Sequence, residues 1–439
     1  MTTTCAILAI GDELTTGQKI DSNSAWLSGR LLDRGIETVE HITVPDDAPA
    51  IGAALRRLAG RARVILITGG LGPTADDLTR DGLAIALGSA QAPEELIEDP
   101  DALAEIRNWF QSTGRRMPEP NRVQALRPRS ARWLHNGYGT APGLRAQIGE
   151  TQVWALPGPP REMRPMFERF VEPELPAPDR AICARFLHCF GAGESRIAEM
   201  LGDLMNRDRN PLVGTTASGG IITCRLRAVF DEVDAAERAL DQTERAVRDR
   251  LGSLIFGAAD DTLESVVLDL LRARTQRLAT VESCTGGGLG AALTDIAGAS
   301  DVYLGGWVTY TNALKTAEVG VPEDLLERHG AVSREVASAM AVGGRTAAGA
   351  DWSLAITGIA GPGGGAQDKP VGTVWIACAG PDDDSGAGSA APDIRRFHFP
   401  GTRNDVRQWS IRSALGMLRL ALTNNRAAPL LRQQDPPAE

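Results

Sequence analysis

Two stretches of the chain show the same alternation of short apolar runs and amphipathic segments, and the first covers residues 1–172. The apolar run CAILAI is followed by a segment in which Trp26, Leu27 and Leu31 recur at helical spacing. RVILITGG and VWALPGPP are further apolar runs, and each leads through a glycine or proline turn into a helical pattern. Strands that alternate with helices predict a parallel sheet covered on both faces, and therefore an α/β fold.

The alternation returns over residues 260–424. LATVESCTGGGLGAALTDIAG predicts a strand, a glycine turn and a helix, while DWSLAITGIAGPGGG and VGTVWIACAG predict two strands around a glycine-rich loop. Residues 173–257, between the two stretches, predict a small open α+β domain that we interpret as a spacer. Residues 425–439 predict a frayed, flexible tail. The chain is therefore predicted to hold three domains and a tail.

Composition places the chain among soluble globular proteins, with 43% hydrophobic and 23% charged residues in 439. No apolar run reaches the ~18 residues of a membrane span, and no basic leader begins the sequence, so we expect a cytoplasmic protein. A net charge of −10 argues against strong nonspecific binding of nucleic acid. The cysteines form no C-x-x-C motif and the five histidines are scattered, which argues against a zinc site.

Candidate nucleophiles gather in the third segment. Hydrolysis of a carboxamide needs a nucleophile, a base and donors for the developing oxyanion. The candidates are Ser283, Cys284 and Ser300, and no histidine lies near any of them in the sequence. A helix cap at Asn312 would put Lys315 in the first turn, where the macrodipole disfavours a cation. We therefore expect this lysine to serve a nearby serine rather than the helix.

Lysine can act as a base when burial lowers its pKa. Ser300 and Lys315 form a coherent pair of this kind, with Tyr310 as a relay. The alternative assigns all three residues to structure: a capping serine, an interfacial tyrosine and a surface lysine. Spacing alone favours that structural alternative.

Two glycine turns of the third segment indicate a phosphorylated substrate. ESCTGGG, between a strand and a helix, brings backbone N–H groups and a helix N-terminus together, and TGIAGPGGG is a second such turn. Tight packing of strand on helix also requires glycine and is the alternative. We expect the substrate-binding residues of these turns to be Ser283, Thr285, Gly286, Gly287 and Gly358.

Acidic residues lie beside glycine turns in the first segment as well. Asp12 and Glu13 occur in GDEL, and Asp76 and Asp77 in GGLGPTADD. Carboxylates with such a turn can hold a hard divalent cation and a phosphate chain, so we expect these four as metal ligands. We expect phosphate contacts from Gly69, Gly70, Gly72 and Thr74. Alternatively, the two later acids cap the helix that starts near Leu78, and Asp12 closes a turn.

The third segment resembles the CinA C-terminal domain, the nicotinamide-mononucleotide deamidase family. The resemblance rests on TVESCTGGGLGAALTDIAGASDVYLGGWVTYTNALKTAEVGV, HGAVSREVASAMA, TGIAGPGGG and KPVGTVWIA, and covers 260–424. It implies hydrolysis of the nicotinamide amide to nicotinate mononucleotide and ammonia, without a cofactor. It also implies Ser300 as nucleophile, assisted by Tyr310 and Lys315, with Thr357 and Arg403 near the substrate. The forked donors of that arginine suit a phosphate or carboxylate.

AIGDELTTGQKIDSNS, TGGLGPTADDLTRDG and LPGPPREM resemble the CinA N-terminal domain, which has a molybdopterin-binding-like, three-layer fold. The order of the segments is similar to full-length CinA, whose middle domain is KH-like. This resemblance implies cleavage of ADP-ribose to AMP and ribose 5-phosphate with a divalent metal (Mg, Mn or Co). It also implies a homodimer. The middle segment carries no obvious GxxG clamp for nucleic acid.

The resemblance therefore predicts a bifunctional enzyme of pyridine-nucleotide recycling that acts on nicotinamide mononucleotide and ADP-ribose. The domains expected are 1–172, 173–257 and 260–424, with a tail over 425–439. One alternative is a molybdopterin-type or nucleotide-binding protein without catalysis. Another is a protein linked to competence or DNA damage, although the acidic net charge counts against direct DNA binding.

Overall fold

The computed structural model describes residues 4–175, 180–381 and 391–434. The chain divides into two compact units, residues 1–184 with 228–239 and residues 185–227 with 240–439. The first unit holds the N-terminal α/β domain. The second holds most of the small middle domain and the whole C-terminal α/β domain.

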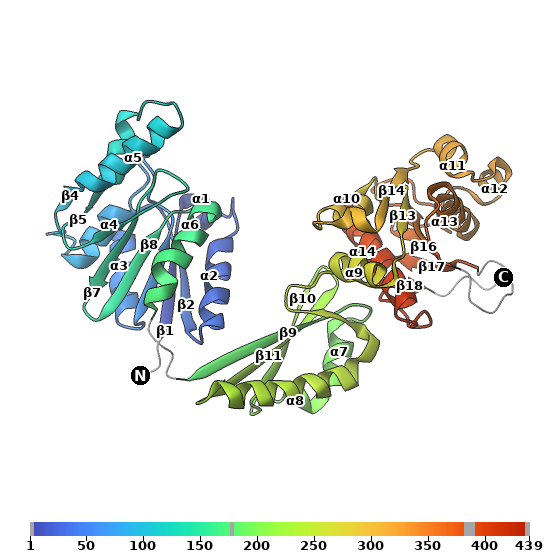
Figure 1. Cartoon of the computed structure of the whole chain (residues 1–439), viewed down its shortest axis with the longest axis horizontal. Helices are drawn as coiled ribbons and strands as arrows, with labels where there is room; N and C mark the ends of the chain where they lie inside the picture. The colour runs from blue at the N-terminus through green and yellow to red at the C-terminus, as the bar shows by residue number, and fades with distance from the viewer. Residues whose placement is uncertain (1–3, 176–179, 382–390, 435–439) are drawn as a thin grey trace. The chain divides into compact units, whose positions relative to one another are not determined.

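The N-terminal domain is built on a six-stranded sheet with the order β2-β1-β3-β8-β7-β6 (Figure 1). β1, β2, β3 and β8 are parallel, whereas β7 and β6 run antiparallel at one edge. The sheet is thus mixed rather than wholly parallel, because a short turn at Gly149 joins β7 to β8 as a hairpin. The strands are β1 (Thr4–Ile10), β2 (Glu37–Val44), β3 (Val64–Thr68), β6 (Arg132–Leu134), β7 (Gly143–Ile148) and β8 (Thr151–Leu156).

Helices cover both faces of this sheet, as the apolar pattern predicts. Leu27 and Leu31 of α2 pack with Met163 of α6 on one face. Ile51 of α3 and Leu83 of α4 belong to the core on the other face. The domain is therefore a three-layer sandwich. Its helices are α1 (Asp12–Thr15), α2 (Ser22–Asp33), α3 (Ala48–Ala59), α4 (Thr79–Leu87), α5 (Pro100–Ser112) and α6 (Pro160–Met166), and β4 (Leu96–Glu98) pairs with β5 (Leu126–Pro128).

The middle domain has a four-stranded sheet with the order β10-β11-β9-β12. β10 and β11 are antiparallel and joined through Gly219 and Gly220, both with positive φ. Its elements are β9 (Ala181–Cys189), α7 (Glu194–Leu201), β10 (Leu212–Ser218), β11 (Ile221–Phe230), α8 (Val233–Leu251) and β12 (Ile255–Ala258). This is the small α+β domain that the sequence predicts.

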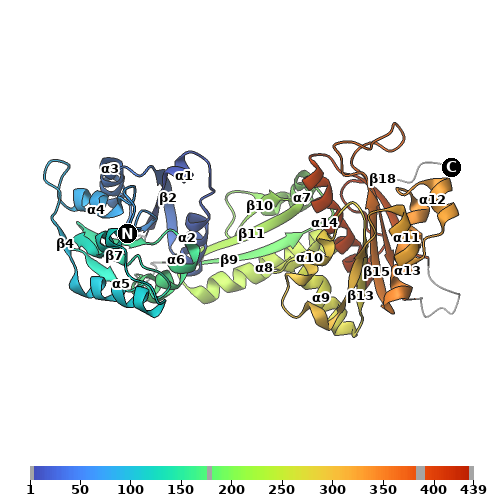
Figure 2. The same ribbon diagram turned by 90° about the horizontal axis from the view of Figure 1, so that it is seen from above.

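The C-terminal domain has a second six-stranded sheet, with the order β14-β13-β15-β16-β17-β18. Figure 2 labels β13, β15 and β18 of this sheet. β13 is parallel to both β14 and β15, and the remaining pairs are antiparallel. The strands are β13 (Leu278–Glu282), β14 (Tyr303–Val308), β15 (Trp352–Gly358), β16 (Thr373–Ala379), β17 (Asp393–His398) and β18 (Gln433–Gln434). Since β13 and β14 run in the same direction, the loops after them meet at one edge of the sheet.

This sheet too is covered on both faces. α9 (Leu263–Arg274), α10 (Gly288–Thr294) and α14 (Arg403–Leu422) contribute to one core, together with Phe190 of the middle domain. α13 (Arg334–Ala348) packs on the other face with α11 (Asn312–Val319) and α12 (Glu323–His329). Arg419 of α14 donates hydrogen bonds to the carbonyl oxygens of Ser253 and Ile255, which ties the middle domain to the C-terminal one.

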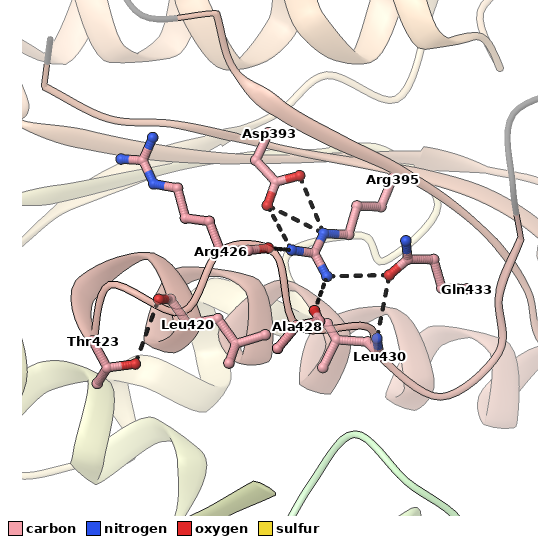
Figure 3. A network of polar contacts seen from close by, with 8 residues as sticks. All are labelled: Asp393, Arg395, Leu420, Thr423, Arg426, Ala428, Leu430 and Gln433. Carbon is pink, nitrogen blue, oxygen red and sulfur yellow. Dashed lines mark hydrogen bonds and ion pairs between the residues drawn. The ribbon is translucent and has the colours of Figure 1, made fainter. Parts of the chain in front are cut away.

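The tail is ordered over 425–434, contrary to the prediction of a frayed segment. Arg395 of β17 is 5% exposed, pairs with Asp393, and donates to the carbonyl oxygens of Arg426 and Ala428 and to Oε1 of Gln433 (Figure 3). Gln433 lies in β18, which pairs with β17. Composition could not predict this, because the contacts that hold the tail come from β17 and from the core into which Leu430 packs. Residues 435–439 lie outside the described residues.

Candidate active sites

Lys315 is the most deeply buried cation of the C-terminal domain's glycine-turn region, with 1% of its surface exposed. Its Nζ donates to the carbonyl oxygen of Thr309 at 2.7 Å and to Oγ of Ser283 at 3.1 Å. Burial lowers the pKa of Lys315 below its usual value, since desolvation disfavours the ammonium form. The lysine therefore has the chemistry of a base and a serine within reach.

The helix that carries this lysine begins one residue earlier than the predicted cap implies. Thr311 is the cap of α11, and its side chain accepts a hydrogen bond from the amide of Leu314. The prediction that Asn312 caps the helix is wrong, and Lys315 opens the second turn. The lysine does contact a serine, but that serine is Ser283 rather than Ser300, and the role of the lysine as its base stays a prediction.

Ser300 does not lie beside Lys315. It is exposed, and it belongs to a 3-10 turn at Ala299–Asp301, just before β14 begins. β14 is parallel to β13, so Ser300 lies at the amino end of the strand whereas Ser283 follows the carboxyl end of β13. The predicted pairing of Ser300 with Lys315 is wrong, because the whole length of β14 separates them. The signal for Ser283 in the sequence was its position directly after β13. This strand is parallel to its neighbour β14, which is also followed by a polar residue.

The turn after Ser283 presents free backbone donors. None of the backbone–backbone hydrogen bonds of the described residues has the amide of Cys284 or Thr285 as donor, and the Cys284 amide interacts with the thiol of its own residue. The side chain of Thr285 is fully buried and its Oγ1 has no partner in the described residues. Arg407 of α14 donates to the carbonyl oxygen of Thr285 at 2.8 Å, which fixes the turn from behind. These amides lie one and two residues beyond the serine, where the oxyanion that forms on a substrate carbonyl attacked by Oγ would need donors.

The start of α10 is already occupied by a carboxylate. Glu282 is 2% exposed and accepts hydrogen bonds from the amides of Leu289 at 2.9 Å and Gly290 at 2.8 Å. The prediction that this helix N-terminus holds a phosphate is therefore wrong. Gly286 and Gly287 have φ values of +60° and +88°, which L side chains rarely adopt. They shape the turn, and their predicted contact with substrate stays a prediction.

Tyr310 and Arg403 meet at the same edge of the sheet. Nη2 of Arg403 donates to the Tyr310 hydroxyl at 2.9 Å, and Nη1 donates to the carbonyl oxygen of Gly361 at 2.8 Å. Tyr310 is 54% exposed. In the part of the chain that the structure describes, no hydrogen bond links its hydroxyl to Ser283 or Lys315. The proton relay through Tyr310 stays a prediction, and the pair is better placed to meet a substrate from solvent.

Thr357 and Gly358 end β15, beside the end of β13. The Thr357 side chain is 1% exposed, and its hydroxyl donates to the carbonyl oxygen of Ala331 at 2.7 Å. The adjoining glycine loop is held by backbone bonds between Ile359 and Thr373 and between Gly372 and Ile359. These amides are used within the fold, so the second turn offers fewer free donors than its sequence suggests.

Cys284 follows Ser283 but points into the core. It is 6% exposed, and burial raises the pKa of its thiol to about 12. Because the thiolate is the reactive form, this cysteine is a poor nucleophile at neutral pH.

The N-terminal domain has a cleft of about 630 Å³ at the carboxyl ends of β1, β3 and β8. Among its lining residues are all the glycines and three of the acids that the sequence singles out: Gly69, Gly70, Gly72, Thr74, Glu13, Asp76 and Asp77. Ligands bind at this edge in open α/β sheets. At Gly69, φ is +104° and a Cβ would lie 2.3 Å from the carbonyl oxygen of Ile10, so no other residue fits where β1 and β3 approach.

Asp12 is hydrogen-bonded to Asp46, a residue that the sequence analysis did not identify. The amide of Asp12 donates to the Asp46 carboxylate at 2.8 Å, and the amide of Asp46 donates to the Asp12 carboxylate at 3.2 Å. The pKa of Asp46 is raised, first by burial and then by the charges of Asp12, Asp76 and Glu13. Asp46 follows β2, which is parallel to β1, and this position was the signal for Asp46 in the sequence.

Asp77 holds its own loop. Its carboxylate accepts hydrogen bonds from the amides of Gly72 at 2.7 Å and Thr74 at 2.8 Å, and from the Thr74 hydroxyl. Asp77 therefore has a structural role within its loop rather than the role of a metal ligand. Asp76 and Asp77 do not cap α4, which has no side-chain cap.

The four predicted metal ligands are not gathered into one set. Glu13 pairs with Lys19 at 3.4 Å, and Asp77 is engaged by the loop. Within the described ranges, no group of three or more histidine, cysteine, aspartate or glutamate side chains is arranged to bind a metal ion. The carboxylates of the cleft have the right chemistry for a hard cation, but Asp12, Glu13, Asp76 and Asp77 together do not form its ligand shell.

Comparison with known proteins agrees with the three parts of this architecture. Residues 6–177 match the family model of a probable molybdopterin binding domain, residues 184–257 that of the damage-inducible protein CinA KH domain, and residues 260–422 that of the CinA C-terminal domain. The chain is therefore an α/β protein with a molybdopterin-binding-like first domain, a KH-like middle domain and a CinA C-terminal domain.

The chain belongs to the CinA family. It is 43% identical over 423 residues to a CinA-like protein of Synechococcus sp. (strain RCC307), covering 95% of this chain and 98% of that protein. It is 42% identical over 412 residues to a putative competence-damage inducible protein of Moorella thermoacetica, covering 93% and 96%. A crystal structure of a CinA superfamily protein from Klebsiella pneumoniae 700603 is 36% identical, with a TM-score of 0.34, and covers 37% of this chain and 96% of that one. Of the helices in the described residues, none is long and apolar enough to cross a membrane.

Proposed function

We propose that the C-terminal domain hydrolyses the carboxamide of nicotinamide mononucleotide, and that the N-terminal domain hydrolyses ADP-ribose. The observation that carries the first half is the distance of 3.1 Å between Nζ of Lys315 and Oγ of Ser283. It joins a buried lysine of lowered pKa to a serine beside two free amides. This is the pattern of an activated nucleophile.

In the proposed reaction the neutral amine of Lys315 takes the proton of the Ser283 hydroxyl, and Oγ attacks the carboxamide carbon. The amides of Cys284 and Thr285 stabilise the oxyanion of the tetrahedral intermediate. The lysine then gives its proton to the leaving nitrogen, which departs as ammonia and leaves an ester on Ser283. Water hydrolyses this ester, with Lys315 again as base, and releases nicotinate mononucleotide and the free serine.

The phosphate of the substrate is assigned to Arg403, and this supports a mononucleotide over a free amide. Its guanidinium donates to two neutral oxygens, those of Tyr310 and Gly361, and forms no ion pair with a carboxylate of the described residues. A planar cation of this kind binds phosphate through two parallel hydrogen bonds. Tyr310 would then contact the nucleotide from the exposed side of the site.

In the N-terminal cleft we propose hydrolysis of the diphosphate bond of ADP-ribose: ADP-ribose and water give AMP and ribose 5-phosphate. The glycine loop at 69–74 and the acids around it support a diphosphate and a divalent cation. Asp46 and Asp76 line the cleft and would supply carboxylates to that cation, with the diphosphate as a further ligand. The metal would neutralise charge on the diphosphate.

A product assay tests both halves together. The full chain is incubated with nicotinamide mononucleotide and with ADP-ribose, each with and without a chelator. Ammonia and nicotinate mononucleotide from the first substrate, and AMP from the second, are the expected products. A chain that binds both compounds and releases none of these products is a nucleotide-binding protein, the alternative without catalysis.

A further inference from the structure

The charged residues that line the cleft of the N-terminal domain are mainly acids, which is unfavourable for a diphosphate. Its charged lining consists of one lysine and six carboxylates, namely Lys19, Glu13, Asp21, Asp46, Asp76, Asp77 and Glu162. Lys19 is itself paired with Glu13 at 3.4 Å, and its side chain is 71% exposed. The lining alone therefore supplies little positive potential for an anionic ligand.

A buried cation lies directly behind the glycine loop of this cleft. Arg80, the second residue of α4, is 2% exposed. Its guanidinium donates to the carbonyl oxygen of Gly72 at 3.2 Å and to that of Leu71. Its Nε has no partner among the described residues. Burial lowers the pKa of Arg80 to about 10, so the group is still a cation at neutral pH.

The neighbouring residue of the helix holds the rest of the loop. The Thr79 hydroxyl donates to the carbonyl oxygen of Gly69 at 2.8 Å, and the Thr79 amide donates to that of Gly70 at 3.1 Å. Four successive carbonyl oxygens, those of residues 69–72, are thus bound from the side of α4. In the described part of the chain, the amides of Gly70 and Leu71 donate no hydrogen bond. A run of carbonyls held on one side leaves such amides for a ligand on the other.

We propose that Arg80 is a positioning residue, which holds the 69–72 loop so that the amides of Gly70 and Leu71 face the cleft and bind a diphosphate. Its buried charge adds a positive potential behind the loop; the charges of Asp77 and Asp81 act on it, but no carboxylate forms an ion pair with it in the described structure. This deepens the function proposed for the cleft and rests on it. Arg80 touches no reacting atom in this proposal.

Arg56 offers a matched control. It too is an arginine that binds backbone carbonyls next to α4, with a distance of 2.8 Å to the oxygen of Gly88 and further bonds to Ile85 and Ala86. These carbonyls lie at the opposite end of the helix, and Arg56 does not line the cleft. An effect of lost packing or helix stability should appear in both variants, whereas an effect on the loop should appear only at Arg80.

The test measures binding by the full chain without turnover. Titration calorimetry with ADP-ribose in the presence of a chelator gives Kd for the wild type, Arg80→Met, Arg80→Lys and Arg56→Met, and circular dichroism checks that each is folded. We expect Kd to rise about tenfold or more in Arg80→Met, the size of a lost charge-assisted contact. Arg80→Lys should lie between, since it keeps the charge but cannot reach both carbonyls. Arg56→Met should bind as the wild type does.

The same Kd in Arg80→Met and the wild type would overturn the proposal. If Arg80→Met does not fold, the test uses Arg80→Lys instead. A Kd for Arg80→Lys equal to that of the wild type then overturns the proposal. If the wild type does not cleave ADP-ribose, the proposed function fails by itself. Titration with inorganic diphosphate then still tests the loop: weaker binding in the Arg80 variants supports the positioning role, and equal or absent binding contradicts it.

Discussion

Nζ of Lys315 lies 3.1 Å from Oγ of Ser283 and 2.7 Å from the carbonyl oxygen of Thr309. Both partners are neutral, and Glu282, the acid next to Ser283 in the sequence, accepts hydrogen bonds from the amides of Leu289 and Gly290 at the start of α10. An ammonium in this position has little to compensate for its lost hydration. The arrangement therefore favours the neutral amine, the form that can activate a hydroxyl.

Deamidation should depend on pH with the sign of a base. Burial lowers the pKa of Lys315, and only the neutral form accepts the serine proton. The rate should therefore be low at acidic pH and rise as pH increases through that lowered value, reaching a plateau below the usual lysine range. Measurement of kcat/KM for nicotinamide mononucleotide across pH 5–10 checks this. A rate that falls as pH rises over this range would assign the lysine another role.

Lys315→Met should separate catalysis from stability. Loss of the base should lower kcat by ~10²-fold or more. The folded state holds the lysine proton less tightly than the unfolded chain does, so below the lowered pKa the buried charge costs stability, and stability rises as pH increases through that value. The methionine variant removes this cost and should unfold at the same or a higher temperature at pH 6. A variant that is both inactive and much less stable would instead show a structural lysine.

Cys284 should be dispensable for the reaction. Its thiol pKa of about 12 leaves almost no thiolate at neutral pH. Cys284→Ser should retain most deamidase activity, and iodoacetamide should inactivate the wild type slowly if at all. Loss of activity in this variant, with folding unchanged, would move the nucleophile to the cysteine.

Chelation should divide the two activities. The mechanism proposed for the C-terminal site uses a serine, a lysine and backbone amides, so EDTA should leave ammonia release unchanged. ADP-ribose cleavage should stop and return when a divalent metal is added in excess. Simultaneous loss of both activities would contradict separate sites. Cleavage that persists in EDTA would show that the carboxylates of the cleft act without metal.

The layers of both α/β domains could be predicted from the sequence because apolar periodicity reports burial directly, as Leu27 and Leu31 show. The partner of Lys315 could not be found by spacing. Ser300 is 15 residues away and Ser283 is 32 residues away, yet β14 carries the chain away from the first and back to the second. The edge of the sheet at which each loop lies determines which serine is close to the lysine.

The same reason explains the errors around the glycine turns. ESCTGGG has the composition of a phosphate turn, but the preceding residue, Glu282, folds back onto the amides of Leu289 and Gly290. Asp46 was missed because its link to Asp12 is made across two parallel strands. Arg395 likewise orders the tail through contacts that no local pattern encodes.

The most direct test of the account compares two serine variants on nicotinamide mononucleotide. Ammonia release by the full chain is measured for Ser283→Ala and for Ser300→Ala, with thermal unfolding as a check on folding. We expect Ser283→Ala to have no activity above background. Ser300 is exposed and lies at the other end of β14, so Ser300→Ala should keep the activity of the wild type. Activity that survives in Ser283→Ala and disappears in Ser300→Ala would contradict it.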